Sequence, residues 1–306
     1  MSDLLPALRV LASFEPVPSL PPCDLEALAP VLVAHGLAPL ASWHAEQTRL
    51  GAGLPEPFRE RLLGFYQGTV NDNVLRMVTL RNTLRDVTVP AVLLEAAAYV
   101  DWLYPHLAWR PVGGLRLAIR GADGAAFAAS VARGGLRPIA TGEEGRTATF
   151  SDGHVELSIQ EGLWPGAAED AALFARARAA PVYGPTAARP APEEALLCAV
   201  GDLAQDALWA PLIRYVDLRE LVRLGPDAGA VRERAERLGL ARALHGATLL
   251  LAWFFPELAD AAAALRPPLG ALERAAVERV VDGARDPARL RHLHGAEAAA
   301  RLVVAP

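Results

Sequence analysis

Two groups of residues in the sequence have side chains suited to chemistry. His154 and Glu156 are two positions apart in a run that alternates like a strand, so both would lie on one face of it. A histidine beside a carboxylate can move protons, although a solvent-facing polar pair has the same pattern. Arg110 and Arg116 lie on either side of the glycine pair at 113–114. Two guanidinium groups beside flexible backbone could bind a phosphate or a carboxylate, or could line a solvated strand edge.

The composition excludes several other chemistries. The formal charge is −5, and all 30 basic residues are arginine, so no lysine can form a Schiff base or act as a base. The two cysteines, Cys23 and Cys198, are far apart and make neither a CxxC motif nor a metal site. No phosphate-binding loop, dinucleotide-binding glycine motif, serine-hydrolase motif or HExxH helix occurs. The acidic balance argues against nucleic acid as a partner.

Length and hydropathy predict a folded protein outside the membrane. At about 150 residues per domain, 306 residues correspond to about two domains or one large one. No stretch approaches the roughly 18 uncharged apolar residues that a membrane-spanning helix needs. The first residues lack the basic segment of a signal peptide. We therefore expect a cytoplasmic protein with no membrane partner.

Hydrophobic periodicity divides the chain into three predicted parts. Residues 1–84 read as N-terminal helices, and Asn73 interrupts the apolar stripe of the last one as a potential buried, hydrogen-bonded group. Residues 85–178 read as a small α/β domain, and residues 192–306 as a helical domain, with an Ala- and Pro-rich boundary between them. The predicted α/β elements are strands at 89–94 and 115–119, a helix at 122–133 and a hairpin at 147–159.

Several short motifs follow one another in a characteristic order. They are HGLAPLA at 35–41, a strand at 92–96, a Tyr-Pro pair at 104–105 before Arg110, strands at 114–119 and 155–158, PEEALL at 192–197 and RYVDLREL at 214–221. Together they resemble the bacterial uncharacterised nucleotidyltransferase family of the DNA polymerase β-like superfamily, over about residues 35–255. The resemblance implies an α+β fold: a small nucleotidyltransferase-like mixed sheet with helices, followed by a helical C-terminal domain.

The resemblance also implies a degenerate active site. The paired aspartates of the family correspond to Gly114 and Arg116, its lysine corresponds to Glu95, and only Glu156 remains at the third carboxylate position. Nucleotidyl transfer needs carboxylates around Mg²⁺ to orient the triphosphate, and an arginine would repel the ion. We therefore expect no catalytic residues, no metal and no cofactor. Glu95 and Arg116 are expected to form an ion pair that fills the former site.

The inherited cleft would then bind something else. The resemblance implies a peptide or protein partner, with a precursor peptide of natural-product biosynthesis as the specific expectation, bound at a sheet edge or between the two halves. The oligomeric state stays open. The expected ligand-binding residues are Glu95, Arg110, Gly114, Arg116, His154 and Glu156.

Three alternatives remain at this point. The chain could be an active Mg²⁺-dependent nucleotidyltransferase with relocated carboxylates at Asp101, Asp123 or Asp152. It could be a structural subunit that only dimerises. It could also be an unrelated helical protein with a small hairpin domain.

Overall fold

The computed structural model describes residues 4–142, 146–164, 166–285 and 303–304, which fall into two compact units. The first, the helical unit, is made of Met1–Gly68, Ala108–Arg110 and Leu196–Pro306. The second, the sheet unit, is made of Thr69–Leu107 and Pro111–Ala195. The two units are therefore interleaved along the chain. The linear division into 1–84, 85–178 and 192–306 stays a prediction.

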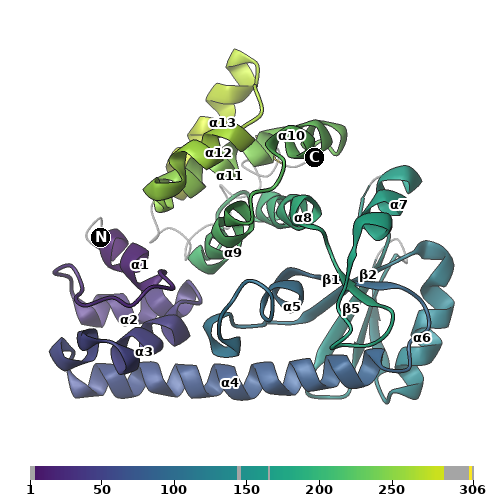
Figure 1. Cartoon of the computed structure of the whole chain (residues 1–306), viewed down its shortest axis with the longest axis horizontal. Helices are drawn as coiled ribbons and strands as arrows, with labels where there is room; N and C mark the ends of the chain where they lie inside the picture. Colours follow the sequence, from purple (N-terminus) through teal and green to yellow (C-terminus); the bar gives the residue numbers. More distant parts are fainter. Residues whose placement is uncertain (1–3, 143–145, 165, 286–302, 305–306) are drawn as a thin grey trace. The chain divides into compact units, whose positions relative to one another are not determined.

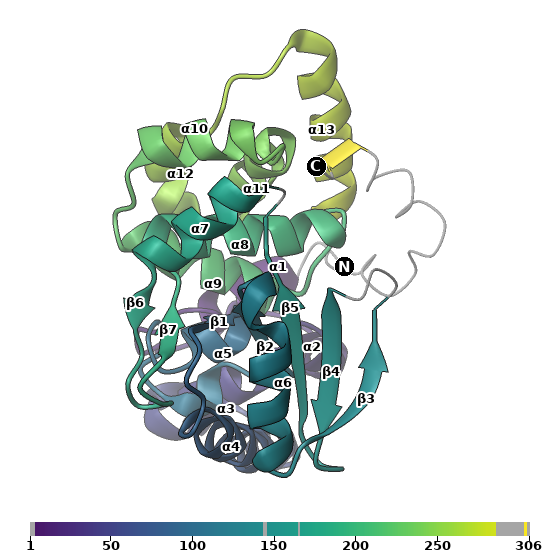
Figure 2. The same cartoon turned by 90° about the vertical axis from the view of Figure 1, so that its right-hand side faces the viewer.

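A mixed seven-stranded sheet runs through the described part of the sheet unit, in the order β3-β4-β5-β2-β1-β7-β6 (Figure 2). The pairs β1–β7 and β2–β5 are parallel, and the other neighbours are antiparallel. The strands are β1 (Ala91–Leu94), β2 (Leu115–Ile119), β3 (Arg137–Thr141), β4 (Thr147–Ser151), β5 (Glu156–Glu161), β6 (Arg178–Ala179) and β7 (Ala187–Arg189).

The central strands separate apolar from polar side chains. Because successive side chains of a strand point to opposite faces, the register places Leu117, Ile159 and their apolar neighbours on one face, where they are buried. Helix α6 (Gly124–Arg133) lies against the sheet (Figures 1 and 2) and buries Phe127 and Val131. The opposite face of β4, β5 and β2 carries polar side chains instead.

The strongest strand patterns are confirmed, and three strands were missed. β1 lies where a short apolar run predicted a buried strand, and β2 and the β4–β5 hairpin lie where alternation and the Asp-Gly turn predicted them. The missed strand β3 contains Pro138 and is exposed along its whole length, as is typical of an edge strand. The missed strands β6 and β7 lie in a region expected to be helical or linker. They have only two and three residues, too few for a periodic pattern.

The remaining helices of the sheet unit include part of α4 (Glu56–Leu84), which also contributes to the helical unit. Asn73 on α4 is fully buried; its amide donates to the Leu107 carbonyl at 2.7 Å, and its carbonyl accepts from the Val112 N–H at 3.0 Å. This confirms the predicted buried polar group. The other helices of the sheet unit are α5 (Glu95–Tyr99) and α7 (Ala167–Arg176).

The helical unit joins N-terminal and C-terminal helices. Its helices are α1 (Leu5–Leu11), α2 (Leu25–Ala34), α3 (Ala38–Gln47), most of α8 (Pro192–Gln205), α9 (Leu212–Arg223), α10 (Ala228–Arg237), α11 (Ala241–Phe254), α12 (Ala259–Leu265) and α13 (Ala271–Ala284), together with part of α4. Among the described residues, no helix has both the length and the apolarity to cross a membrane.

The HGLAPLA stretch contacts α9 and so joins an N-terminal and a C-terminal segment of the chain within the helical unit. His35 Nδ1 accepts from the Leu212 N–H at 2.9 Å, and the His35 carbonyl accepts from the Ile213 N–H at 3.1 Å. Two N–H groups that α9 leaves without an intrahelical acceptor are thereby satisfied. Gly36 turns the chain with φ +69° against Ile213. The motif therefore has a structural task, the docking of α2 on the start of α9.

Candidate functional site

Arg116 lies at the centre of the polar side of the sheet. The register aligns it with Ser158 of β5, and Ser158 with Thr149 of β4. Gln160 is two positions further along β5, on the same side. We call Arg116, Thr149, Ser158 and Gln160 the polar face. All four side chains are only half-buried, so they are accessible from one side of the sheet.

The guanidinium of Arg116 is held by two neighbours. Its Nη1 donates to Glu95 Oε1 at 2.5 Å, and its Nη2 donates to Gln160 Oε1 at 2.6 Å. The Arg116 and Glu95 side chains are 25% and 32% exposed. The ion pair predicted from the sign-inverted residues is therefore confirmed.

Glu95 adopts an unusual backbone conformation. It follows directly after β1, and its φ is +52°, in the left-handed region that side chains rarely occupy. Such conformations cost about 1–3 kcal/mol and cluster at ligand clamps and active sites. The conformation places the carboxylate against Arg116 on the neighbouring strand.

The hydroxyl groups extend the polar face away from Arg116. Thr149 Oγ1 and Ser158 Oγ are 3.2 Å apart and share a hydrogen bond. Each hydroxyl can both donate and accept. Gly114, immediately before β2, is exposed, and a Cβ added there would meet nothing within 4 Å. The arrangement offers a held cation, a carboxylate, an amide and two hydroxyls, all of which can form hydrogen bonds.

Glu156 begins β5, whereas His154 lies in the turn before the strand, so the expectation that both lie on one strand is wrong for His154; both residues are exposed. Asp152 in the preceding turn accepts from the N–H groups of Val155 at 2.8 Å and His154 at 2.9 Å. These two hydrogen bonds lower the pKa of Asp152, because they stabilise its charged form. The surroundings match the solvent-facing polar pair. A ligand-binding role for His154 and Glu156 stays a prediction.

Arg110 belongs to the helical unit and has a buried partner there. Its Nε and Nη2 donate to the Asp217 carboxylate of α9 at 2.8–3.0 Å, and both residues are less than a tenth exposed. A bidentate pair of this kind is a strong, geometrically specific contact. It joins the Arg110 segment to the RYVDLREL motif. A ligand-binding role for Arg110 stays a prediction.

The three spare carboxylates have identifiable surroundings. Asp101 pairs with Arg189 at 3.3 Å, Asp123 is the N-cap residue of α6, and Asp152 closes the β4–β5 turn. Asp123 and Asp152 therefore lie at a helix start and in a turn, two places where acidic residues commonly have a structural role. Within the described ranges, no group of three or more His, Cys, Asp or Glu side chains is arranged to hold a metal ion.

Sequence reasoning did not find Thr149, Ser158 and Gln160. The signal was present in β5, where Glu156, Ser158 and Gln160 alternate with apolar residues. Alternation indicated a polar side of the strand but not which strand lies next to it. The contact between Gln160 and Arg116 depends on the parallel β2–β5 pairing, between residues 44 positions apart.

The mixed sheet and the helices make this an α+β protein. The chain belongs to the uncharacterised nucleotidyltransferase family, because the model of that family matches residues 21–256. This confirms the resemblance and the fold class inferred from the order of the motifs. Neither the curated proteins nor the solved structures gave a match.

Proposed function

We propose that this chain is a catalytically inactive member of its family that binds a peptide or protein partner through carboxylate groups of that partner. The observation that carries the proposal is the Arg116 guanidinium, held on the polar face by Glu95 and Gln160. It lies at a position that corresponds to a metal-binding aspartate in the motif resemblance. A guanidinium binds carboxylates directly, with no metal between them.

The pairing of Glu95 with Arg116 supports the proposed loss of catalysis. The Glu95 carboxylate is already paired with Arg116, so it is not offered to a divalent cation. Catalysis of nucleotidyl transfer depends on carboxylates that hold Mg²⁺ against the triphosphate. The combination favours a binding site over a transfer site.

The partner engages Arg116 by exchange or by addition. A carboxylate of the partner replaces Glu95, or shares the guanidinium with it, while the hydroxyls of Thr149 and Ser158 bind polar groups further along the face. The finer proposal is a precursor peptide of natural-product biosynthesis. It rests on the family resemblance rather than on a contact.

A peptide-binding measurement tests this proposal. The probe is a fluorescent extended peptide of alternating Glu and Ser, compared with the same peptide carrying Gln in place of Glu. We expect micromolar binding of the acidic peptide only, and loss of it in Arg116→Asp. Arg178→Asp makes the same charge change on β6 at the far edge of the sheet and serves as control. Equal binding of both peptides, or unchanged binding by Arg116→Asp, would overturn the proposal.

An active nucleotidyltransferase is the second candidate, favoured by the description of the family. Thermal unfolding with each of the four NTPs and Mg²⁺ separates the two. A ligand at 100 times its Kd stabilises the folded state by about 2.7 kcal/mol, which would raise the Tm of a chain this size by roughly 5–11 °C. A Mg²⁺-dependent rise would refute inactivity and direct attention to Asp101, Asp123 and Asp152. We expect no rise.

A structural, dimerising subunit is the third candidate. Val74, Leu75 and Val78 of α4 are each more than two fifths exposed, which is unusual for large apolar side chains on one helix. Light scattering of the wild type and of Leu75→Glu tests it. A dimer that becomes monomeric in the variant while acidic-peptide binding is absent would favour this candidate over the proposed function.

A further inference from the structure

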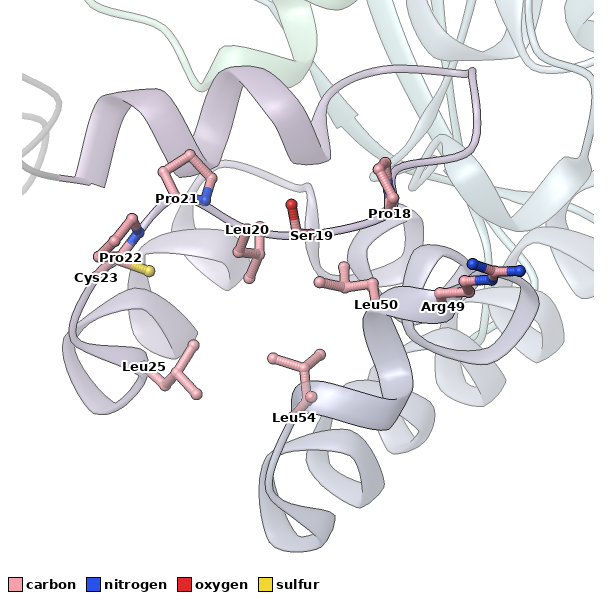
Figure 3. Close-up of a pocket in the computed structure, with 11 residues that line it drawn as sticks. Pro18, Ser19, Leu20, Pro21, Pro22, Cys23, Leu25, Arg49, Leu50 and Leu54 are labelled. Atoms are coloured by element: carbon pink, nitrogen blue, oxygen red, sulfur yellow. The ribbon is translucent and has the colours of Figure 1, made fainter.

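A small pocket in the helical unit is separate from the polar face. It lies between the proline-rich segment 18–23 and the residues around η2 (Arg49–Gly53), and its volume is about 300 Å³ (Figure 3). All of its lining residues come from the first 54 residues of the chain. Its lining therefore belongs to one compact unit and needs no contribution from the sheet.

Polar and apolar atoms contribute almost equally to the exposed lining of this pocket, and the side chains of its apolar part are mainly aliphatic. Leu20, Leu25, Leu50 and Leu54 surround the space, and Figure 3 shows their side chains gathered around it. The wall opposite η2 contains three prolines, at positions 18, 21 and 22. Proline has no backbone N–H, so these positions offer a ligand no hydrogen-bond donor. Such a lining suits a hydrocarbon chain.

The two ends of the pocket differ in charge. Arg49 is exposed at one end and has no ion-pair or hydrogen-bond partner among the residues that the structure describes. Cys23 and Leu25 lie at the other end (Figure 3). Asp24 is next to that end, and its carboxylate accepts from the Glu26 N–H at 3.0 Å and the Ala27 N–H at 3.3 Å. An anionic group is therefore attracted to the Arg49 end and repelled from the Cys23 end.

The volume limits the size of the ligand. A water molecule occupies about 30 Å³ of liquid, and a methylene group takes a similar space, so the pocket holds about ten non-hydrogen atoms. An unbranched carboxylate of eight carbons has that size. Small-molecule pockets commonly combine apolar walls with placed polar groups, and this one has leucines together with Arg49.

We propose that this pocket binds a medium-length unbranched aliphatic carboxylate, with the carboxylate on Arg49 and the chain along the leucines toward Cys23. The ligand class follows from the aliphatic walls, the single unpaired guanidinium at one end and the volume. The proposal is independent of partner binding at the polar face.

Protection of Cys23 from alkylation tests it, with octanoate as the probe. Cys23 is half-buried in the pocket wall, and burial together with Asp24 raises the pKa of its thiol, so alkylation is followed at mildly alkaline pH. Peptide mapping by mass spectrometry separates Cys23 from the buried Cys198, whose alkylation reports unfolding. We expect millimolar octanoate to slow alkylation of Cys23 severalfold without affecting Cys198, and octanol to do so more weakly.

Two variants make the test specific. Arg49→Gln should weaken protection by octanoate about fivefold, the value of an exposed ion pair, and should abolish the preference over octanol. Leu54→Trp should fill the pocket and remove protection by both compounds. Arg61→Gln on α4, an exposed arginine outside the pocket, is the matched control and should behave as wild type.

Two outcomes of the alkylation experiment would overturn the proposal. Equal protection by octanoate and octanol in the wild type would overturn the assignment of a carboxylate. Absence of protection by either compound, with Cys198 unreactive, would overturn the assignment of a binding site.

Discussion

Arg110 and Asp217 show how two motif residues far apart in the chain serve one structural purpose. Their buried bidentate pair satisfies both charges inside the helical unit. A buried ion pair adds little net stability over apolar residues of the same size, but removal of one partner leaves the other as a buried charge without a counterion. The pair therefore specifies how the Arg110 segment lies on α9, more than it stabilises the fold.

Removal of one member of this pair should be costly. We expect Asp217→Asn to lower the free energy of unfolding by about 3–5 kcal/mol, because Arg110 keeps its charge without a counterion. The double variant Arg110→Met with Asp217→Leu should lose much less. Urea unfolding of the three proteins measures this. A double variant as unstable as Asp217→Asn would show that the charges themselves stabilise the fold.

His44 on α3 should make stability depend on pH. Burial lowers its pKa from 6.5 to about 4, and its Nε2 is 3.0 Å from the Ser13 carbonyl. Between these two pKa values the unfolded chain binds a proton that the folded protein does not, so stability is lost as the pH falls from about 7 to 4. The loss from this group reaches at most about 3 kcal/mol.

The His44→Gln variant isolates this contribution. Glutamine can still donate to the Ser13 carbonyl but does not titrate. Urea unfolding at several pH values should give a shallower fall in the variant than in the wild type below pH 7. Identical slopes would mean that other groups account for the acid sensitivity.

At the scale of elements, the α2–α3 turn sets the position of α9. Gly36 has φ +69°, and a Cβ there would lie 3.0 Å from Ile213 Cγ2. Gly225, after α9, has the same φ of +69° but no atom within 4 Å of an added Cβ. Comparing the two glycines therefore distinguishes the cost of backbone strain, which a side chain would have at both positions, from the cost of crowding, which it would have only at Gly36.

Alanine at each position tests this distinction. We expect Gly225→Ala to cost about 1 kcal/mol, the penalty of a side chain in the left-handed region. Gly36→Ala should cost about 2 kcal/mol, since the methyl group also displaces Ile213. Ile213→Ala, which removes Cγ2, should therefore cost less in the Gly36→Ala background than in the wild type. Equal losses at the two glycines, measured by thermal unfolding, would refute a role for the Ile213 contact.

An element can be predicted from the sequence when the interactions that form it join residues close together in the chain. β2 was predicted because five alternating residues follow a glycine pair, and α4 because its apolar spacing persists over many turns. β7 has three residues and becomes a strand through its pairing with β1, almost a hundred positions away. Pairing of this kind leaves no periodic trace in a short segment.

The candidate site follows the same rule. The Glu95–Arg116 pair was predictable because both residues replace residues of opposite charge in one family motif order. Gln160 was not, because its contact with Arg116 depends on the register between two strands. The Asp217 partner of Arg110 was missed for the same reason: each residue was visible in its own motif, but their contact spans 107 positions.

At the scale of the whole molecule, interleaving of the two units predicts where the chain can be divided. The sheet unit takes residues before position 85 and after position 178. Asn73 bonds to Leu107 and Val112, and β7 covers the edge of β1 through Ala187 and Ala188. A fragment limited to 85–178 lacks all of these contacts.

We therefore expect residues 69–195 to fold alone and residues 85–178 not to. The longer fragment has the length of a typical domain, about 100–150 residues, and keeps all seven strands of the described sheet. The shorter one leaves β1 as an open edge, where unpaired N–H and C=O groups favour aggregation. Thermal unfolding followed by circular dichroism should be cooperative only for 69–195, with slow amide exchange in β1. Cooperative unfolding of 85–178 would show instead that the linear α/β segment is a domain by itself and that it folds without α4 and β7.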